Sequence, residues 1–135
     1  MISSRNLNEL RPEVKNAALN FIAQCSVAGI ELLVTSTFRD VESQNRLYAV
    51  GRTLPGKIVT NAKGGASFHN YRVAFDVVPI LHGKAVWDDK KLWAKIGSIG
   101  KSSGLDWAGD WHTFRELAHF QLTGGKTIAE FLDGC

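Results

Sequence analysis

One short segment, residues 71–80, constrains the fold of this chain more than any other. Nearly every position in it is apolar, and the β-branched and aromatic content predicts a strand. Val73 and Phe75 would lie on one face of this strand, and Ala74 and Asp76 on the other. Any fold of this chain must therefore pack an apolar strand that carries a carboxylate at Asp76 among apolar neighbours.

Periodic segments on both sides of this strand predict the rest of the architecture. We expect helices over Pro12–Cys25, from Asp40 to Gly51, over Lys90–Ser103 and over Ile128–Leu132, and further strands over Ile30–Thr35 and Leu117–Leu122. Residues 51–67, with several glycines and Pro55, should be mostly loop. The predicted class is α+β, with helices packed against a small antiparallel sheet and a site in a cleft on that sheet.

Length and composition predict a single domain over residues 1–135. No repeat or Pro/Ser-rich linker divides the chain, and 44% hydrophobic residues supply a core that needs no metal or disulfide to fold. The two cysteines, Cys25 and Cys135, lack C-x-x-C spacing, so we expect free thiols. We also expect a monomer.

The charge pattern excludes some partners. Sixteen Lys and Arg against thirteen Asp and Glu give +3, but the basic residues are scattered, so no nucleic-acid partner is expected. The apolar run around Ile30–Val34 is too short for membrane insertion. The N-terminal residues lack the apolar core of a secretory signal, so we expect the chain to begin in the cytoplasm.

Two histidines and one carboxylate stand out as candidate metal ligands. His69 precedes the predicted strand that carries Asp76, and His119 lies in the later strand. This ligand count leaves a fourth tetrahedral position for water, as in catalytic zinc sites, and Glu116 could take a proton from that water. Taken singly, Asp76 could equally be a turn or capping residue and each histidine a structural one.

Other catalytic signatures are absent from the sequence. There is neither an H-E-x-x-H pair nor a G-x-S-x-G elbow, and the cysteines lack a nucleophile signature. Three of the four tryptophans, Trp87, Trp93 and Trp107, are expected to pack in the core or loops rather than to bind sugar. Trp111 is the exception, since it precedes the candidate site.

The spacing of these residues resembles that of the zinc L-alanyl-D-glutamate endopeptidases of phage endolysins, relatives of D-Ala-D-Ala carboxypeptidases and of the hedgehog domain. That family carries Ser-x-His-x-x-Gly-x-Ala-x-Asp, and Ser67, His69, Ala74 and Asp76 match it. A late acid-x-x-His of the family is matched by Glu116 and His119, together with the wider run 107–114. Upstream segments 35–39 and 44–53 look like the family's Arg-and-Gln segment.

The resemblance implies a role for each matching residue. It implies that His69, Asp76 and His119 bind zinc, that Glu116 is the general base and that Arg39 stabilises the oxyanion. It further implies that three residues contact the substrate: Gln44, Ser67 and Trp111. Arg72 departs from the pattern, because glycine is usual there, either for a backbone angle or for space beside the metal.

The implied activity is hydrolysis of the L-Ala–D-Glu bond of peptidoglycan, leading to bacterial cell-wall lysis. The expected partner is peptidoglycan, and a separate holin-type pore would release the protein from the host cytoplasm. Two alternatives remain open at this point: a D-Ala-D-Ala carboxypeptidase, and a non-catalytic cell-wall-binding module. The presence of Glu116 argues against the module, because a structural metal site needs no base.

Overall fold

The computed structural model describes residues 1–112 and 115–133, and Cys135 lies outside this range. Its elements follow the order η1 (Leu7–Glu9), α1 (Pro12–Val27), β1 (Glu31–Ser36), α2 (Val41–Ala49), η2 (Phe68–Tyr71), β2 (Ala74–Leu81), β3 (Lys84–Ala85), α3 (Lys90–Ser102), β4 (Asp106–Trp107), η3 (Ala108–Asp110), β5 (His119–Gln121) and α4 (Ile128–Leu132). The predicted α+β class is confirmed.

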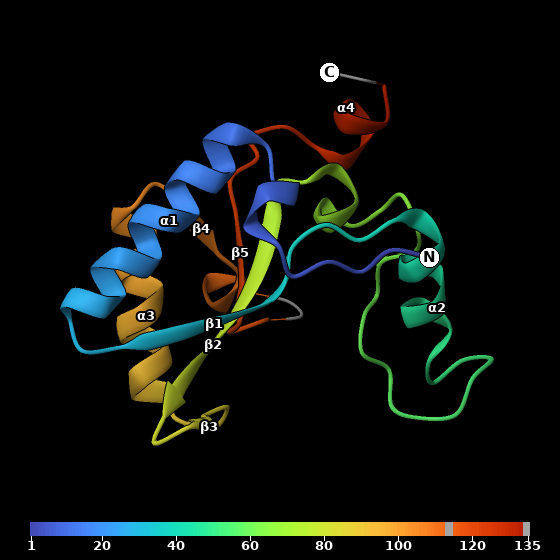
Figure 1. Cartoon of the computed structure of the whole chain (residues 1–135). Helices are drawn as coiled ribbons and strands as arrows, with labels where there is room; N and C mark the ends of the chain where they lie inside the picture. The colour runs from blue at the N-terminus through green and yellow to red at the C-terminus, as the bar shows by residue number, and fades with distance from the viewer. Residues whose placement is uncertain (113–114, 134–135) are drawn as a thin grey trace.

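The strands form one antiparallel sheet in the order β1-β2-β5-β4, with β3 paired to β2. Helices α1 and α3 cover one face of it, whereas α2 and the long connection after it lie on the other side of the strands (Figure 1). Across the two described ranges, the helices are too short or too polar for a membrane span.

The core fills the space between the sheet and helices α1 and α3. Phe21 of α1 contacts Phe75 of β2 and Phe120 of β5, with ring centroids 6.1 and 4.6 Å apart. Trp93 and Ile96 of α3 are also fully buried there. Because side chains alternate along a strand, the neighbours of Phe75 and Phe120 must face away from this core.

Helix boundaries follow capping chemistry. Pro12 occupies the first turn of α1, the side chains of Asp40 and Asp89 cap α2 and α3, and Gly29 and Gly104 follow α1 and α3 with positive φ. The four predicted helices are confirmed with small shifts of their ends. Cys25 is buried within α1, and this burial raises the pKa of its thiol to about 11.

The predicted strand over residues 71–80 was placed too early, and the predicted strand over 117–122 was too long. Phe68–Tyr71 form a 3₁₀ turn capped by Ser67, and Arg72 takes a left-handed conformation with φ 64°, so extended backbone begins only at Ala74. The later strand contains only His119–Gln121. The two-residue strands β3 and β4 were not predicted, because segments this short carry no periodic pattern.

The left-handed backbone at Arg72 explains why glycine is usual at this position. The side chain compensates: its guanidinium lies 3.9 Å from the ring centroid of Phe38 and pairs with Glu9 of η1. Arg72 thereby ties η1 to the segment after β1. Its effect is conformational, since Arg72 does not line the cleft described below.

The left-handed conformation predicts a specific order of stability at position 72. Arg72→Ala keeps the strained backbone and loses both contacts, so it should destabilise the fold by about 1 kcal/mol. Arg72→Gly loses the same contacts but removes the strain, and it should be about 1 kcal/mol more stable than Arg72→Ala. Urea unfolding of the three proteins measures this order, and equal stability of the Ala and Gly variants would contradict the left-handed assignment.

Candidate active site

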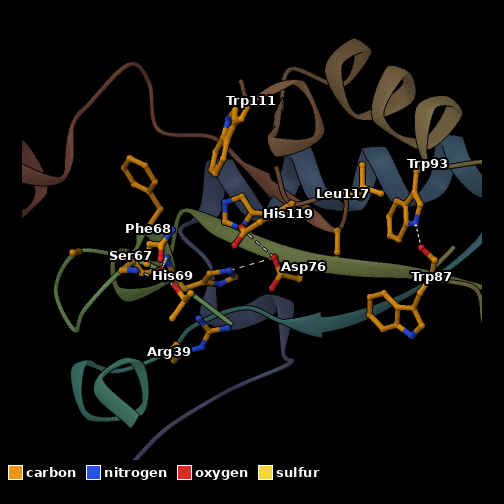
Figure 2. A pocket seen from close by; sticks show the side chains of 16 residues that line it. Arg39, Ser67, Phe68, His69, Asp76, Trp87, Trp93, Trp111, Leu117 and His119 are labelled. Atoms are coloured by element: carbon orange, nitrogen blue, oxygen red, sulfur yellow. Dashed lines mark hydrogen bonds and ion pairs between the residues drawn. The ribbon is translucent and has the colours of Figure 1, made fainter. Parts of the chain in front are cut away.

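The strand pairing brings Asp76 and His119 together on the side of the sheet opposite the helical core. Asp76 of β2 pairs directly with His119 of β5, as Phe75 pairs with Phe120 on the other face. The His119 Nδ1 atom lies 3.1 Å from Asp76 Oδ1, and the His69 Nε2 atom lies 3.3 Å from the same oxygen. Both imidazoles are almost fully buried, whereas Asp76 is one-quarter exposed. Figure 2 shows the three side chains converging.

Each histidine is oriented by a hydrogen bond from its other ring nitrogen. His69 Nδ1 lies 2.8 Å from the carbonyl oxygen of Thr37, and His119 Nε2 lies 2.8 Å from Gln121 Oε1. Both partners are acceptors, so these two nitrogens carry the hydrogen. In neutral histidines the nitrogens that face Asp76 then present lone pairs. Partner groups of this kind fix the tautomer and ring orientation of metal-ligating histidines.

This donor set fits a divalent cation. One ligand atom from each of His69, Asp76 and His119 lies within 4.8 Å of the other two. Two lone pairs and a carboxylate oxygen facing one another repel unless a proton or a metal ion lies between them. Two imidazoles and one carboxylate, with an open fourth position, are typical of catalytic zinc.

Glu116 and Arg39 flank this cluster. Glu116 Oε2 lies 3.6 Å from His119 Nδ1, and its carboxylate is about one-third exposed. Burial raises the pKa of Glu116; the positive charges of His119, His69 and Arg39 oppose this shift, and Asp76 adds to it. A carboxyl group with a raised pKa is suited to accept and return a proton near neutral pH.

The Arg39 guanidinium is held rigidly at the edge of the cleft. Its Nη1 donates to Gln44 Oε1 (2.8 Å) and its Nη2 to Ser36 Oγ (2.9 Å), while the buried Nε has no partner among the described residues. Burial lowers the pKa of Arg39 below its ordinary value, and the charges of Asp76 and Glu116 oppose this shift only in part. Three of its five N–H donors are therefore uncommitted, and its charge faces the metal-ligand cluster.

The backbone around Arg39 is held by distant parts of the chain. Residues 2–4 form three backbone hydrogen bonds with residues 37–40, and the Arg39 amide donates to the carbonyl of His69 (3.2 Å). Asn70 returns a bond from its side chain to the Arg39 carbonyl (2.8 Å). These contacts hold Thr37 and Arg39 in a fixed relation to His69.

These groups line one open cleft of about 640 Å³. The cleft is lined by the three candidate metal ligands, by the candidate base Glu116, and by Arg39, Ser67 and Trp111. It is also lined by several residues for which the sequence predicted no role at the site: Thr60, Asn61, Ala62, Phe68 and Trp87. The ring of Trp111 lies 5.5 Å from that of His119. The substrate roles of Ser67 and Trp111 stay predictions, and Ser67 also caps the turn that carries His69.

Gln44 lies behind Arg39 and does not line the cleft. Its side chain is 1% exposed and donates to the carbonyl of Ala62 (2.8 Å) while accepting from Arg39. This placement favours a role in positioning Arg39, and direct substrate contact by Gln44 stays a prediction. Gln121 and Thr37 were missed in the sequence because a hydrogen bond to a ligand's second nitrogen leaves no sequence signal.

Two buried histidines and a carboxylate that fit a cation, with a second carboxylate and a fixed guanidinium beside them in one cleft, are typical of the active site of a metal-dependent hydrolase. Comparison with known proteins places the chain more narrowly. Residues 60–122 match the family model described as D-alanyl-D-alanine carboxypeptidase. The chain is 36% identical over 124 residues to the peptidoglycan L-alanyl-D-glutamate endopeptidase CwlK of Bacillus subtilis, covering 85% of this chain and 74% of that protein. The chain therefore belongs to the family of peptidases that includes CwlK.

A phage relative agrees with this assignment, and two solved structures share the fold. The chain is 31% identical over 132 residues to the L-alanyl-D-glutamate peptidase of Listeria phage A118, covering 89% of this chain but only 40% of the phage protein. Among solved structures, the Serratia marcescens L-Ala D-Glu endopeptidase ChiX has a TM-score of 0.67 at 21% identity, covering 90% of this chain and 89% of that one. The D,D-pentapeptidase VanY in complex with Zn(II) has a TM-score of 0.66 at 13% identity, covering 98% and 89%. These structures confirm the predicted fold.

The paired geometry predicts the titration of His119 in the metal-free protein. Burial lowers the pKa of His119, but its hydrogen bond to Asp76 and the charges of Asp76 and Glu116 outweigh burial, so the pKa is raised above 6.5. NMR titration should show a His119 pKa above the ordinary value for histidine, and the substitution Asp76→Asn should lower this pKa. Because the folded-state pKa is raised, the pairing stabilises the fold below about pH 6.5, and this stabilisation is lost as the pH rises through the folded-state pKa. An unchanged His119 pKa in Asp76→Asn would contradict the pairing.

Proposed function

We propose that this chain is a zinc-dependent peptidoglycan peptidase that hydrolyses the L-Ala–D-Glu bond of the stem peptide. The observation that carries the proposal is the convergence of His69, Asp76 and His119 beside Glu116 and Arg39 in one cleft. The names of CwlK and of the phage relative support the bond and the substrate, and the Zn(II) complex of VanY supports the metal.

The chain's own residues divide the work of peptide hydrolysis. Zinc at His69, Asp76 and His119 would supply a Lewis acid and lower the pKa of a bound water. Glu116 takes the proton of the attacking water at its carboxylate and delivers it to the leaving nitrogen. Arg39 donates hydrogen bonds to the carbonyl oxygen as negative charge develops there, and such a donor contributes about 3 kcal/mol to transition-state stabilisation.

The phage relative also supports a lytic role. We propose that the protein acts on the cell wall after release from the host cytoplasm by a separate pore-forming protein. A D-Ala-D-Ala carboxypeptidase remains the second candidate, because the matching family model carries that description. The two activities leave different products: the endopeptidase creates a new amino terminus at D-Glu, whereas the carboxypeptidase releases free D-Ala.

The first test concerns the metal. Purified protein should hold one zinc per chain by elemental analysis, and His119→Ala should lose it, because only two ligands remain. Leu81→Ala, an exposed residue outside the cleft, is the matched control and should retain zinc. Zinc affinity should fall as the pH drops, since the histidines must be deprotonated to bind. Full zinc retention in His119→Ala would exclude this site.

The second test separates an enzyme from a binding module. Glu116→Gln keeps the size of the side chain but cannot accept the proton, so zinc content and thermal stability should be retained while turnover falls by roughly 10² to 10⁴. Mass analysis of fragments from purified peptidoglycan measures turnover and also identifies the bond. Parental turnover in a zinc-loaded Glu116→Gln protein would refute the mechanism, and release of D-Ala alone would favour the carboxypeptidase.

A further inference from the structure

An exposed tryptophan lies at the end of the cleft away from Ser67 and Phe68. Trp87 lines the same cleft as the metal-ligand cluster and is 53% exposed. Within residues 1–112 and 115–133, no other Phe, Tyr or Trp is classed as exposed. Figure 2 shows its indole on one side of Asp76, with Ser67, Phe68 and Trp111 on the other. Of the two places predicted for the packing of Trp87, the core and the loops, the structure excludes the core, whereas Trp93 is buried there.

The backbone that carries Trp87 is fixed, although its side chain is exposed. The indole N–H of Trp93 donates to the Trp87 carbonyl (2.9 Å), and the amide of Val86 donates to the carbonyl of Pro79 (2.9 Å). Two residues further on, Asp89 caps α3 through the amide of Leu92 (3.0 Å). An aromatic face held open to solvent on an anchored backbone is suited to bind a flat, partly apolar ligand with little loss of entropy.

The chain segments that form the two ends of the cleft differ in formal charge. Between Glu42 and Asp76 the chain contains no Asp or Glu but five Lys and Arg, and this segment also supplies Thr60, Asn61, Ala62 and Ser67 of the cleft wall. The five basic side chains do not line the cleft, so they act on a ligand there only at longer range. Residues 88–91, next to Trp87, contain two aspartates and two lysines, so this segment attracts neither sign of charge.

We propose that Trp87 binds the muramoyl sugar to which the stem peptide is attached; this inference rests on the proposed function. The substrate has a division of charge that corresponds to that of the two chain segments. On one side of the L-Ala–D-Glu bond lie the carboxylates of D-Glu and of the residues beyond it. On the other side lie L-Ala and the lactyl group, whose carboxyl is neutral because it forms an amide. Two such units span about 7 Å when extended, so the sugar ring follows closely on the bond that is cleaved.

Stacking of the sugar on Trp87 makes a specific kinetic prediction. Two substrates are compared: the stem peptide with an acetylated amino terminus, and the same peptide linked to N-acetylmuramic acid. The parent protein should cleave the sugar-linked peptide with a kcat/KM about tenfold higher, the scale of one aromatic stacking contact. Trp87→Ala should reduce this ratio to about one, and Trp87→Phe, which keeps an aromatic face, should retain most of it. The control substitution Leu81→Ala, at an exposed residue of β2 outside the cleft, should leave the ratio unchanged.

The outcomes distinguish this inference from the function on which it rests. Equal cleavage of both substrates by the parent would overturn the sugar site and leave the proposed function intact. The same would follow if Trp87→Ala lowered kcat/KM equally for both substrates, because Trp87 would then act only through the shape of the cleft. If the parent cleaved the L-Ala–D-Glu bond of neither substrate, both proposals would be overturned.

Discussion

The antiparallel pairing of β2 with β5 determines both the core and the active site. In its register Phe75 faces Phe120, and Asp76 faces His119. The aromatic pair packs against Phe21 of α1, so the polar pair must lie on the opposite side of the sheet. A shift of one residue between these strands would bury Asp76 beneath the helices. The hydrophobic core therefore selects the register that brings the candidate metal ligands together.

The assembled ligands in turn require positive charge. Hydrogen bonds to Thr37 and Gln121 place the lone pairs of both histidines toward the oxygen of Asp76. Arg39 supplies one fixed charge nearby, and a proton on His119 or a metal ion among the ligands supplies another. Burial weakens solvent screening of these groups, so the two histidines lower the pKa of Asp76 against the effect of burial, and Asp76 and Glu116 raise the pKa of His119. The pKa of Glu116 is raised mainly by burial itself. The same electrostatic environment that fits a cation also raises the pKa of Glu116, as the proposed proton transfer requires.

The sequence predicted the parts of this arrangement that depend on local pattern. The helices were found from apolar periodicity and caps such as Asp40, and the ligands from residue types whose spacing matched a family. The predicted start of the central strand failed at Arg72, because nothing local marks a left-handed arginine held by Glu9 and Phe38. Contacts between segments that are distant in the sequence could not be predicted either. The bonds of residues 2–4 to the Arg39 segment, and the placement of Gln44 behind Arg39, depend on tertiary structure alone.

The fold keeps its stability largely separate from its chemistry. The fully buried side chains of Phe21, Phe75, Ile96 and Phe120 lie in or around the layer between the sheet and the helices α1 and α3, and Trp93 belongs both to this core and to the wall of the cleft. The cleft on the other side is formed by loops and strand ends, where Asp76, Glu116 and Trp87 keep contact with solvent. A core of this size holds a 135-residue chain without a metal. Loss of a ligand should therefore impair the site far more than the fold, since the aromatic contacts that fix the strand register do not involve the ligands.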